Sequence, residues 1–169
     1  MMSTAKPMTM TPVDVVVESA LWAAEPGAEE AVRRAIVAAA ATVLALPAAA
    51  GEVSVVLTDD AAIRSLNRQW RKIDQPTNVL SFPAPRSAAG TPSLLGDIAV
   101  AFETTAREAA AEHKPLSHHL AHLAVHGFLH LLGYDHESDE AADEMERLEA
   151  RILARLDVPD PYAARAAEA

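Results

Sequence analysis

Histidines are concentrated in one short part of the chain. Five of the seven lie between residues 118 and 130, and a sixth follows at His136. Residues four apart on a helix lie one turn apart on the same face, so we expect the rings of His126 and His130 to point the same way. Gly133 can adopt the left-handed conformation that ends a helix, and the chain can then bring His136 back toward the first two rings. The spacing therefore predicts three converging imidazoles.

Three neutral imidazoles that meet at one point are the ligands of a zinc site whose fourth position is open. We therefore predict one Zn²⁺ per chain on His126, His130 and His136. The chain contains no cysteine, which excludes disulfide frameworks, cysteine zinc sites and thiol nucleophiles. Histidine and carboxylate side chains are the residues left to bind a metal.

Two neighbours of these histidines each allow two interpretations. His122 lies one turn before His126 on the same stripe. It either orients a ligand or contacts substrate, or it is a buried histidine bonded to a backbone carbonyl. Asp135 is either the acceptor of an imidazole N–H or a turn residue that receives backbone hydrogen bonds.

The spacing His-x-x-x-His-x-x-Gly-x-x-His is that of the metzincin proteases. In those enzymes a glutamate follows the first histidine and acts as the general base. This chain has Gly127 at that position, and glycine cannot transfer a proton. The motif thus predicts a metzincin-like zinc helix that lacks the peptidase base.

The charge of the chain is unevenly distributed. The net charge of −10 argues against nucleic-acid binding through total charge. Residues 64–86 nevertheless contain four arginines and a lysine against one aspartate, whereas residues 137–149 contain seven acids against one arginine. Most such runs are solvated helix faces. The polar segment from Asp74 to Asn78, which leads directly into an apolar strand, favours a function for the basic run.

The pattern of apolar residues predicts one α/β domain, with a small sheet of about four strands packed with about five helices. We expect strands over 13–17, 53–57, 78–82 and 97–102, and helices that begin at Pro26, Thr58 or Asp59, Thr105, Ser117 and Ser138. Thr105 and Glu108 form the capping box of the third helix. The domain is expected over residues 13–157, between a flexible arm (1–12) and a flexible tail (158–169).

No apolar run approaches the roughly 20 residues of a membrane span. Residues 1–12 also lack the apolar core of a secretory signal. We therefore expect a cytoplasmic protein without a membrane partner.

Three stretches together resemble the YbeY family of bacterial endoribonucleases. They are Asn67 to Pro83, Leu95-Gly-Asp-Ile98, and Ala121-His-Leu-Ala-Val125 running into the histidine motif. The resemblance implies a single-domain α/β fold, zinc on the three histidines and a functional arginine at Arg71. It also implies cleavage of single-stranded RNA in the 3′-end maturation of small-subunit (16S) ribosomal RNA and in ribosome quality control. The small ribosomal subunit and the GTPase Era are the partners that it implies.

The residues themselves indicate how such a site works. A three-histidine zinc lowers the pKa of its bound water to about 7 and polarises a phosphoryl oxygen. The planar guanidinium of Arg71 matches phosphate bidentately and can stabilise the charge that develops there. Arg64, Arg68 and Lys72 are expected to steer the RNA strand. Trp70 is expected to be a core residue, with base stacking as the alternative. No residue is evident as the general base.

Two alternatives stay open at this point. One is a zinc metallopeptidase. The other is a non-catalytic ribosome-assembly factor whose metal is structural. A structural zinc normally has four protein ligands, and the motif supplies three unless His122 is the fourth.

Overall fold

The sheet of this protein has four strands. A computed structural model describes residues 12–43, 51–85 and 94–163. Within these ranges the strands are β1 (Val13–Val17), β2 (Glu52–Thr58), β3 (Val79–Pro83) and β4 (Leu94–Ala101). Their order is β1-β2-β4-β3. β1, β2 and β4 run parallel, whereas β3 pairs antiparallel with β4 and forms one edge of the sheet.

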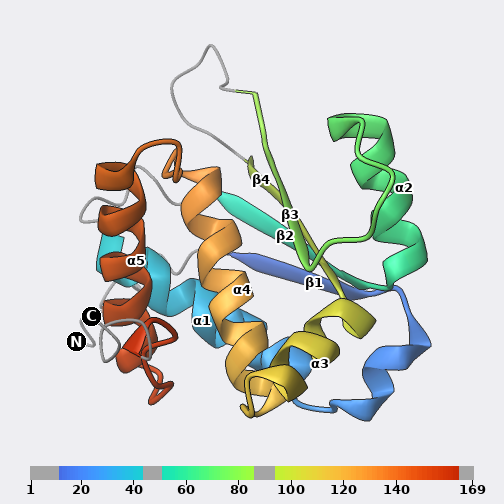
Figure 1. Ribbon diagram of the computed structural model, residues 1–169, viewed down its shortest axis with the longest axis horizontal. Coiled ribbons are helices and arrows are strands. Elements are labelled where there is room, and N and C mark those ends of the chain that lie inside the picture. Colours follow the sequence, from blue (N-terminus) through green and yellow to red (C-terminus); the bar gives the residue numbers. More distant parts are fainter. Residues whose placement is uncertain (1–11, 44–50, 86–93, 164–169) are drawn as a thin grey trace, which may run out of the picture.

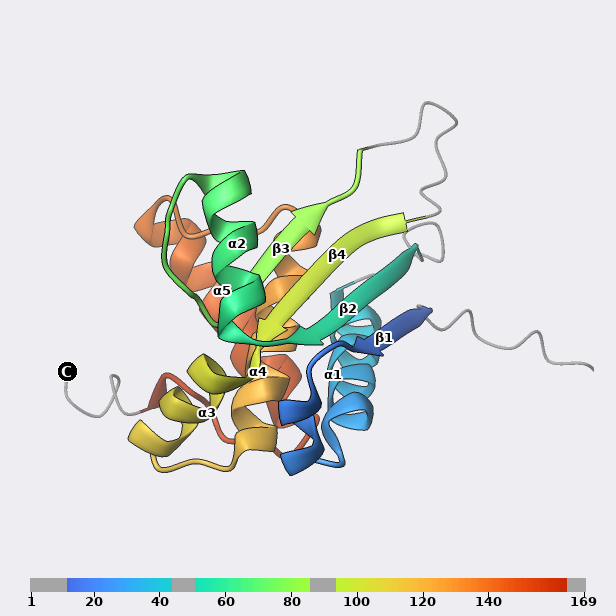
Figure 2. The same ribbon diagram turned by 90° about the vertical axis from the view of Figure 1, so that its right-hand side faces the viewer.

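Helices cover both faces of this sheet. The described ranges contain the 3-10 helix η1 (Ala20–Ala24) and the α-helices α1 (Ala28–Val43), α2 (Asp60–Arg71), α3 (Phe102–Ala111), α4 (Leu116–Leu131) and α5 (Asp139–Ala154). α1, α4 and α5 lie on one side of the sheet and α2 lies on the other (Figure 1, Figure 2). The predicted α/β class, with four strands and five α-helices, is confirmed.

Alternating side chains of β4 pack into two separate cores. Ile98 and Val100 lie in the large cluster that contains the apolar residues of α1, α4 and α5. Ala99 and Ala101 point the other way and pack with Ile63 of α2. This follows from the pleat of a strand, in which successive side chains point to opposite faces. The smaller cluster holds α2 against β3 and β4.

Gly127 allows α4 to lie close to the sheet. A Cβ atom at this position would be 3.0 Å from Cγ2 of Ile98 and 3.1 Å from Oγ of Ser81. The hydroxyl of Ser81 donates a hydrogen bond to the carbonyl of Gly127 at 3.0 Å. Position 127 therefore faces β3 and β4, and the histidines before and after it are held near the edge strand.

The predicted capping box is wrong. α3 begins at Phe102, and Thr105 lies inside the helix, where its hydroxyl donates to the carbonyl of Ala101 at 2.6 Å. Glu108 instead accepts a hydrogen bond from the side chain of Asn78. The strand predicted through residue 102 accordingly ends at Ala101.

A carboxylate from another helix caps α3. Oδ1 of Asp60 accepts the backbone N–H of Thr104 at 3.1 Å and its hydroxyl at 2.7 Å. In return Oε1 of Glu103 accepts the backbone N–H of Asp60 at 2.9 Å. Helix N-termini favour such acceptors because their first N–H groups have no partner within the helix. The two helices therefore cap each other, and this exchange joins α2 to α3.

Residues 1–11, 44–50, 86–93 and 164–169 lie outside the described residues, and these include most of the predicted arm and part of the predicted tail. The other predicted helix starts lie within two residues of the observed ones, and Asp59 and Ser138 both act as N-caps. In the part of the chain that the structure describes, no helix is both long and apolar enough to cross a membrane.

Candidate metal centre and adjoining groove

Three imidazole rings meet near the C-terminal end of α4. His126 and His130 project from this helix, and His136 comes from the loop between α4 and α5. The Nε2 atom of His126 lies 3.1 Å from that of His130 and 3.3 Å from that of His136. Zinc–nitrogen bonds of about 2.0–2.1 Å at tetrahedral angles place two nitrogens roughly 3.3 Å apart. The donor set therefore fits a tetrahedral metal ion.

The turn after α4 brings His136 to the other two rings. Gly133, two residues beyond the end of the helix, has a φ of 99°. Glycine adopts this left-handed region without strain. The backbone N–H of Tyr134 then donates to the carbonyl of Leu129 at 3.1 Å. The chain reverses here, as the position of the glycine predicts.

A buried carboxylate lies beside the cluster. Glu149 of α5 has 0% of its surface exposed. Its Oε1 accepts a hydrogen bond from Nδ1 of His126 at 2.6 Å, and its Oε2 accepts from Nε2 of His122 at 2.9 Å and from the hydroxyl of Tyr162. Because an ionised carboxylate only accepts, Nδ1 of His126 carries the proton. The lone pair on its Nε2 atom then faces the other two rings.

The surroundings keep Glu149 ionised and His130 neutral. Burial by itself raises the pKa of Glu149, but the hydrogen bonds from His122 and His126 outweigh burial and hold the pKa at about 2. Burial, together with the charges of His126 and His136, lowers the pKa of His130 to about 4. At neutral pH the ring of His130 therefore presents a lone pair, the form in which imidazole binds a metal.

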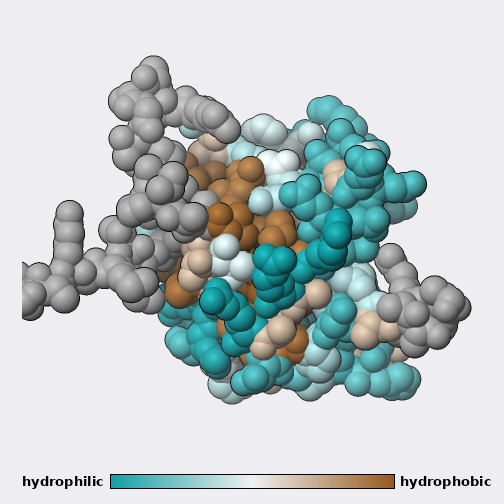
Figure 3. All heavy atoms as spheres, turned by 90° about the vertical axis from the view of Figure 1, so that its left-hand side faces the viewer, coloured by the Kyte–Doolittle hydropathy of each residue, from teal (hydrophilic) through white to brown (hydrophobic). Residues whose placement is uncertain are grey.

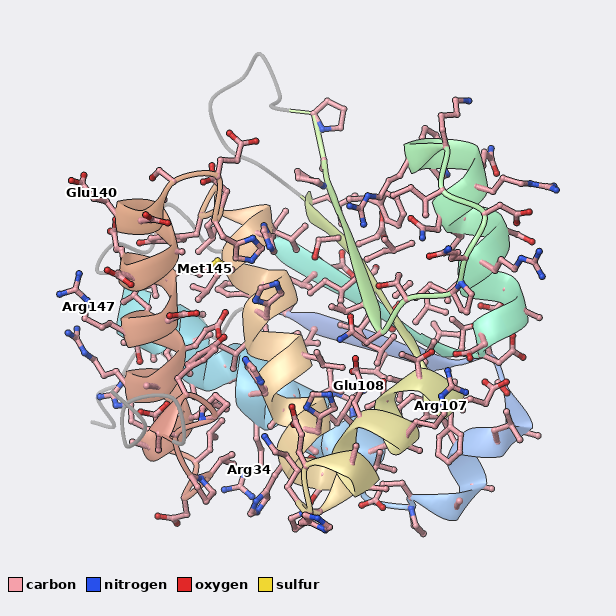
Figure 4. All side chains as sticks on the ribbon, in the orientation of Figure 1. Arg34, Arg107, Glu108, Glu140, Met145 and Arg147 are labelled. Carbon is pink, nitrogen blue, oxygen red and sulfur yellow. The ribbon has the colours of Figure 1, made fainter. Side chains whose placement is uncertain are left out.

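Sequence reasoning missed Glu149 because it treated the acidic run as a solvated face. That description holds for five of the seven acids in the run, which are exposed: Glu137, Asp139, Glu140, Asp143 and Glu144. Hydrophilic residues cover much of the side that α5 presents (Figure 3). Glu149 instead lies on the apolar stripe of α5, four residues after Met145 and three before Ile152. Figure 4 shows Met145 turned toward α4, whereas Glu140 and Arg147 point outward. The position of an acidic residue on the apolar stripe of a helix was the sequence signal that could have identified Glu149 as a buried residue.

The structure places the two ambiguous neighbours differently. His122 contacts the cluster through Glu149, and it is outside the group of His126, His130 and His136, whose ligand atoms all lie within 4.8 Å of one another. Asp135 follows the pattern of a turn residue, because its Oδ1 accepts the backbone N–H of Glu137 at 3.1 Å.

A groove of about 550 Å³ joins the histidines to the far side of β3. One wall is formed by His126, His130 and His136, with Asp135 and Glu137 beside them. The other wall contains Arg71, the last residue of α2, and residues of β3. Residues separated by more than fifty positions in the chain thus face one space. A guanidinium and three imidazoles around a groove of this size suit an anionic ligand.

The C-terminal end of α2 is held in place by Asn67. Its buried side-chain amide donates to the backbone carbonyl of Gln75 at 2.9 Å, and the backbone carbonyl of Asn67 accepts the N–H of Ile73. These bonds fold the segment after the helix back onto α2. Lys72 has a φ of 62° and forms the left-handed C-cap. Arg71 is therefore positioned by the end of the helix and by the turn that follows it.

The other basic residues of α2 lie outside the groove lining. Arg64 forms two hydrogen bonds with Asp74, at 2.9 and 3.2 Å. This pair raises the pKa of Arg64 and lowers that of Asp74 through the hydrogen bonds and their charges. Arg68 and Lys72 are exposed on the same helix end.

Comparison with known proteins gives a consistent result. The family model described as Endoribonuclease YbeY matches residues 22–157. A Bradyrhizobium protein of that name is 58% identical over 90% of this chain and 92% of its own length. One from Nitrobacter hamburgensis is 57% identical over 89% of this chain and 81% of its own length. A Thermotoga maritima protein solved in solution shares the fold, with a TM-score of 0.52 and 23% identity over 86% of this chain and 91% of the other.

Proposed function

Since the chain belongs to the YbeY family of endoribonucleases, we propose that it hydrolyses phosphodiester bonds of single-stranded RNA with the help of one Zn²⁺ ion. The proposed task is 3′-end maturation of small-subunit (16S) ribosomal RNA, together with ribosome quality control. The small ribosomal subunit and the GTPase Era are the proposed partners, and the cytoplasm is the proposed location.

One observation carries the proposal. Arg71 lies on one wall of the groove, and His126, His130 and His136 lie on the other. A phosphodiester between these walls meets a guanidinium that can bind two of its oxygens. The same phosphodiester lies beside three nitrogens whose spacing fits a tetrahedral metal.

Each residue then has a separate task in the reaction. Zinc, when bound, supplies Lewis acidity and a water of lowered pKa. Glu149 keeps the proton of His126 on Nδ1, so that Nε2 is available to the metal. Arg71 binds the non-bridging oxygens of the phosphate and offsets the negative charge that grows on them during attack. Glu149 is buried and accepts three hydrogen bonds, so it is unsuited to act as a general base.

The proposed role of Glu149 predicts an effect on metal affinity. Replacing Glu149 with Gln keeps the shape of the side chain but removes the charge that holds two imidazole protons. We expect zinc affinity to fall about 10- to 100-fold, measured by competition with a coloured chelator. Glu144→Gln, an exposed change on the same helix, is the matched control and should leave affinity unchanged. Equal zinc affinities in the two variants would show that Glu149 does not support the metal site.

The metallopeptidase alternative is disfavoured by the direction in which position 127 points. Introducing the missing protease base as Gly127→Glu would force a side chain against Ile98 and Ser81. We expect this variant to lose about 1–3 kcal/mol of unfolding free energy in urea, as overpacked cores do, and to gain no activity on casein. A stable variant that digests casein would favour a peptidase.

The function itself is tested on protein purified without a polyhistidine tag or chelators. We expect one zinc per chain by elemental analysis, and cleavage of single-stranded RNA but not of duplex RNA or casein. Chelation should abolish cleavage, and added Zn²⁺ should restore it. Proteolysis without RNA cleavage would overturn the proposal, and so would RNA cleavage that is unaffected by removal of the metal.

A further inference from the structure

Trp70 is the most exposed large apolar side chain among the described residues. It lies in the last turn of α2 with 64% of its surface exposed, whereas the other tryptophan, Trp22, is 2% exposed. The indole N–H of Trp22 donates to the carbonyl of Thr58 at 2.8 Å, so that ring has a structural partner. The core position expected for Trp70 from its sequence context is therefore wrong. A large aromatic ring left in water suggests a ligand.

The ring of Trp70 is supported from one side. Its centroid lies 6.1 Å from that of Phe82 on β3, and the two rings meet edge to face at 61°. Phe82 itself is partly buried against the small cluster under α2. An aromatic pair of this kind limits the movement of the indole. The exposed part of the ring is thereby presented as a fixed surface.

The position of Trp70 connects it to the groove. The next residue in the chain, Arg71, lines the groove, and so do Ser81 and Pro83 on either side of Phe82. The indole thus stands beside the wall that carries Arg71, outside the lining itself. A strand whose phosphate is bound by Arg71 has its neighbouring nucleotides within reach of this ring.

The charges around Trp70 favour a polyanion. Arg68 and Arg71 occupy the last turn of α2, and Lys72 follows as its C-cap. Among the basic residues of α2, Arg64 forms an ion pair with Asp74. Basic residues interleaved with an exposed aromatic ring are the arrangement by which proteins bind single-stranded nucleic acids, with bases stacked on the ring and phosphates on the cations.

We propose that Trp70 is a nucleobase-binding site, on which an unpaired base of the RNA stacks next to the phosphodiester held by Arg71. This inference rests on the proposed function. It gives a physical reason for single-strand preference, because a base within a duplex is already stacked on both faces and cannot cover the indole. The site tolerates any base, since each has an aromatic face.

The two tryptophans make a direct binding test available. The emission of the holoenzyme is recorded by stopped-flow mixing with oligouridylate, before cleavage proceeds, and with the same strand annealed to oligoadenylate. We expect the single strand to quench the emission and the duplex to quench it far less. Trp70→Phe should abolish the response of the tryptophan emission, because the buried Trp22 is then the remaining tryptophan.

Steady-state kinetics separates stacking from a structural role. Trp70→Ala should raise KM for the single strand roughly 5- to 100-fold, the range that loss of one stacked base produces, with a much smaller change in kcat. Trp70→Phe keeps an aromatic face and should restore KM to within a few-fold of wild type. Leu21→Ala, at an exposed apolar residue of η1, is the control and should leave KM unchanged.

The outcomes distinguish this inference from the function on which it rests. If the holoenzyme cleaves RNA but its emission does not respond to the single strand, or if Trp70→Ala leaves KM unchanged, the nucleobase site is wrong and the ring serves another partner, such as a protein surface. If Trp70→Phe is as impaired as Trp70→Ala, stacking is also wrong. If the holoenzyme neither binds nor cleaves RNA, the proposed function falls and the inference falls with it.

Discussion

Replacing His126 with alanine is expected to abolish both metal binding and RNA cleavage. The change removes one of three converging nitrogens, so that the remaining pair cannot complete a tetrahedral site. Cleavage should fall by at least about a thousand-fold, because the water of lowered pKa and the Lewis acid are lost together. Zinc content by elemental analysis and initial rates on single-stranded RNA measure the two effects.

The same substitution also removes one of the hydrogen bonds that the buried carboxylate of Glu149 accepts. Glu149 loses its 2.6 Å contact with Nδ1 of His126 and keeps those with His122 and Tyr162. We expect a loss of about 1–3 kcal/mol in unfolding free energy. His118→Ala, on the same helix but outside the ligand group, is the control. A folded His126→Ala protein that cleaves RNA at the wild-type rate would refute metal catalysis at this site.

Arg71→Ala is expected to lower kcat/KM for single-stranded RNA by about 100- to 1,000-fold while zinc content stays at one per chain. Arg71 lines the same groove as the histidines but does not belong to the group of candidate metal ligands, so its loss should not affect zinc binding. The loss follows from removal of a fixed positive charge where negative charge develops in the transition state. Most of the effect should therefore appear in kcat.

Two further variants test the geometry of this contact. Arg71→Lys keeps the charge but loses the planar fork, and should recover only part of the activity. Arg147→Ala removes an exposed arginine on α5, away from the groove, and should retain wild-type kinetics. If Arg71→Ala and Arg147→Ala behave alike, or if Arg71→Ala loses its zinc, the phosphate-binding role is refuted.

Local patterns predicted most of the secondary structure because they depend on neighbouring residues. The β-branched run at 13–17 forms a strand, and Ser138 caps the last helix, as expected. The error at α3 has a tertiary cause. The N-terminus of that helix is capped by Asp60, more than forty residues earlier, so no acceptor was needed at the start of α3 itself.

Exposure was harder to predict than structure type. Trp70 follows the period of α2, yet the helix ends at the next residue, and its ring lies beyond the small cluster formed by Ile63, Leu80, Ala99 and Ala101. The acids of α5 illustrate the converse case, because Glu149 belongs to a charged run but faces inward. In both helices a side chain is buried only where a neighbouring element packs over it, and a helix sequence does not show how far that element reaches.

The convergence of His126, His130 and His136 was determined by sequence alone. It requires the period of a helix and a glycine at φ 99°, both of which act over a few residues. The tertiary structure decided what surrounds that cluster. α5 had to pack on α4 before Glu149 could reach His126, and α2 had to pack across the sheet before Arg71 could face the same groove. Those contacts join residues that are far apart in the chain. Their positions relative to one another are set by the packing of the helices against the sheet, which buries the two apolar cores.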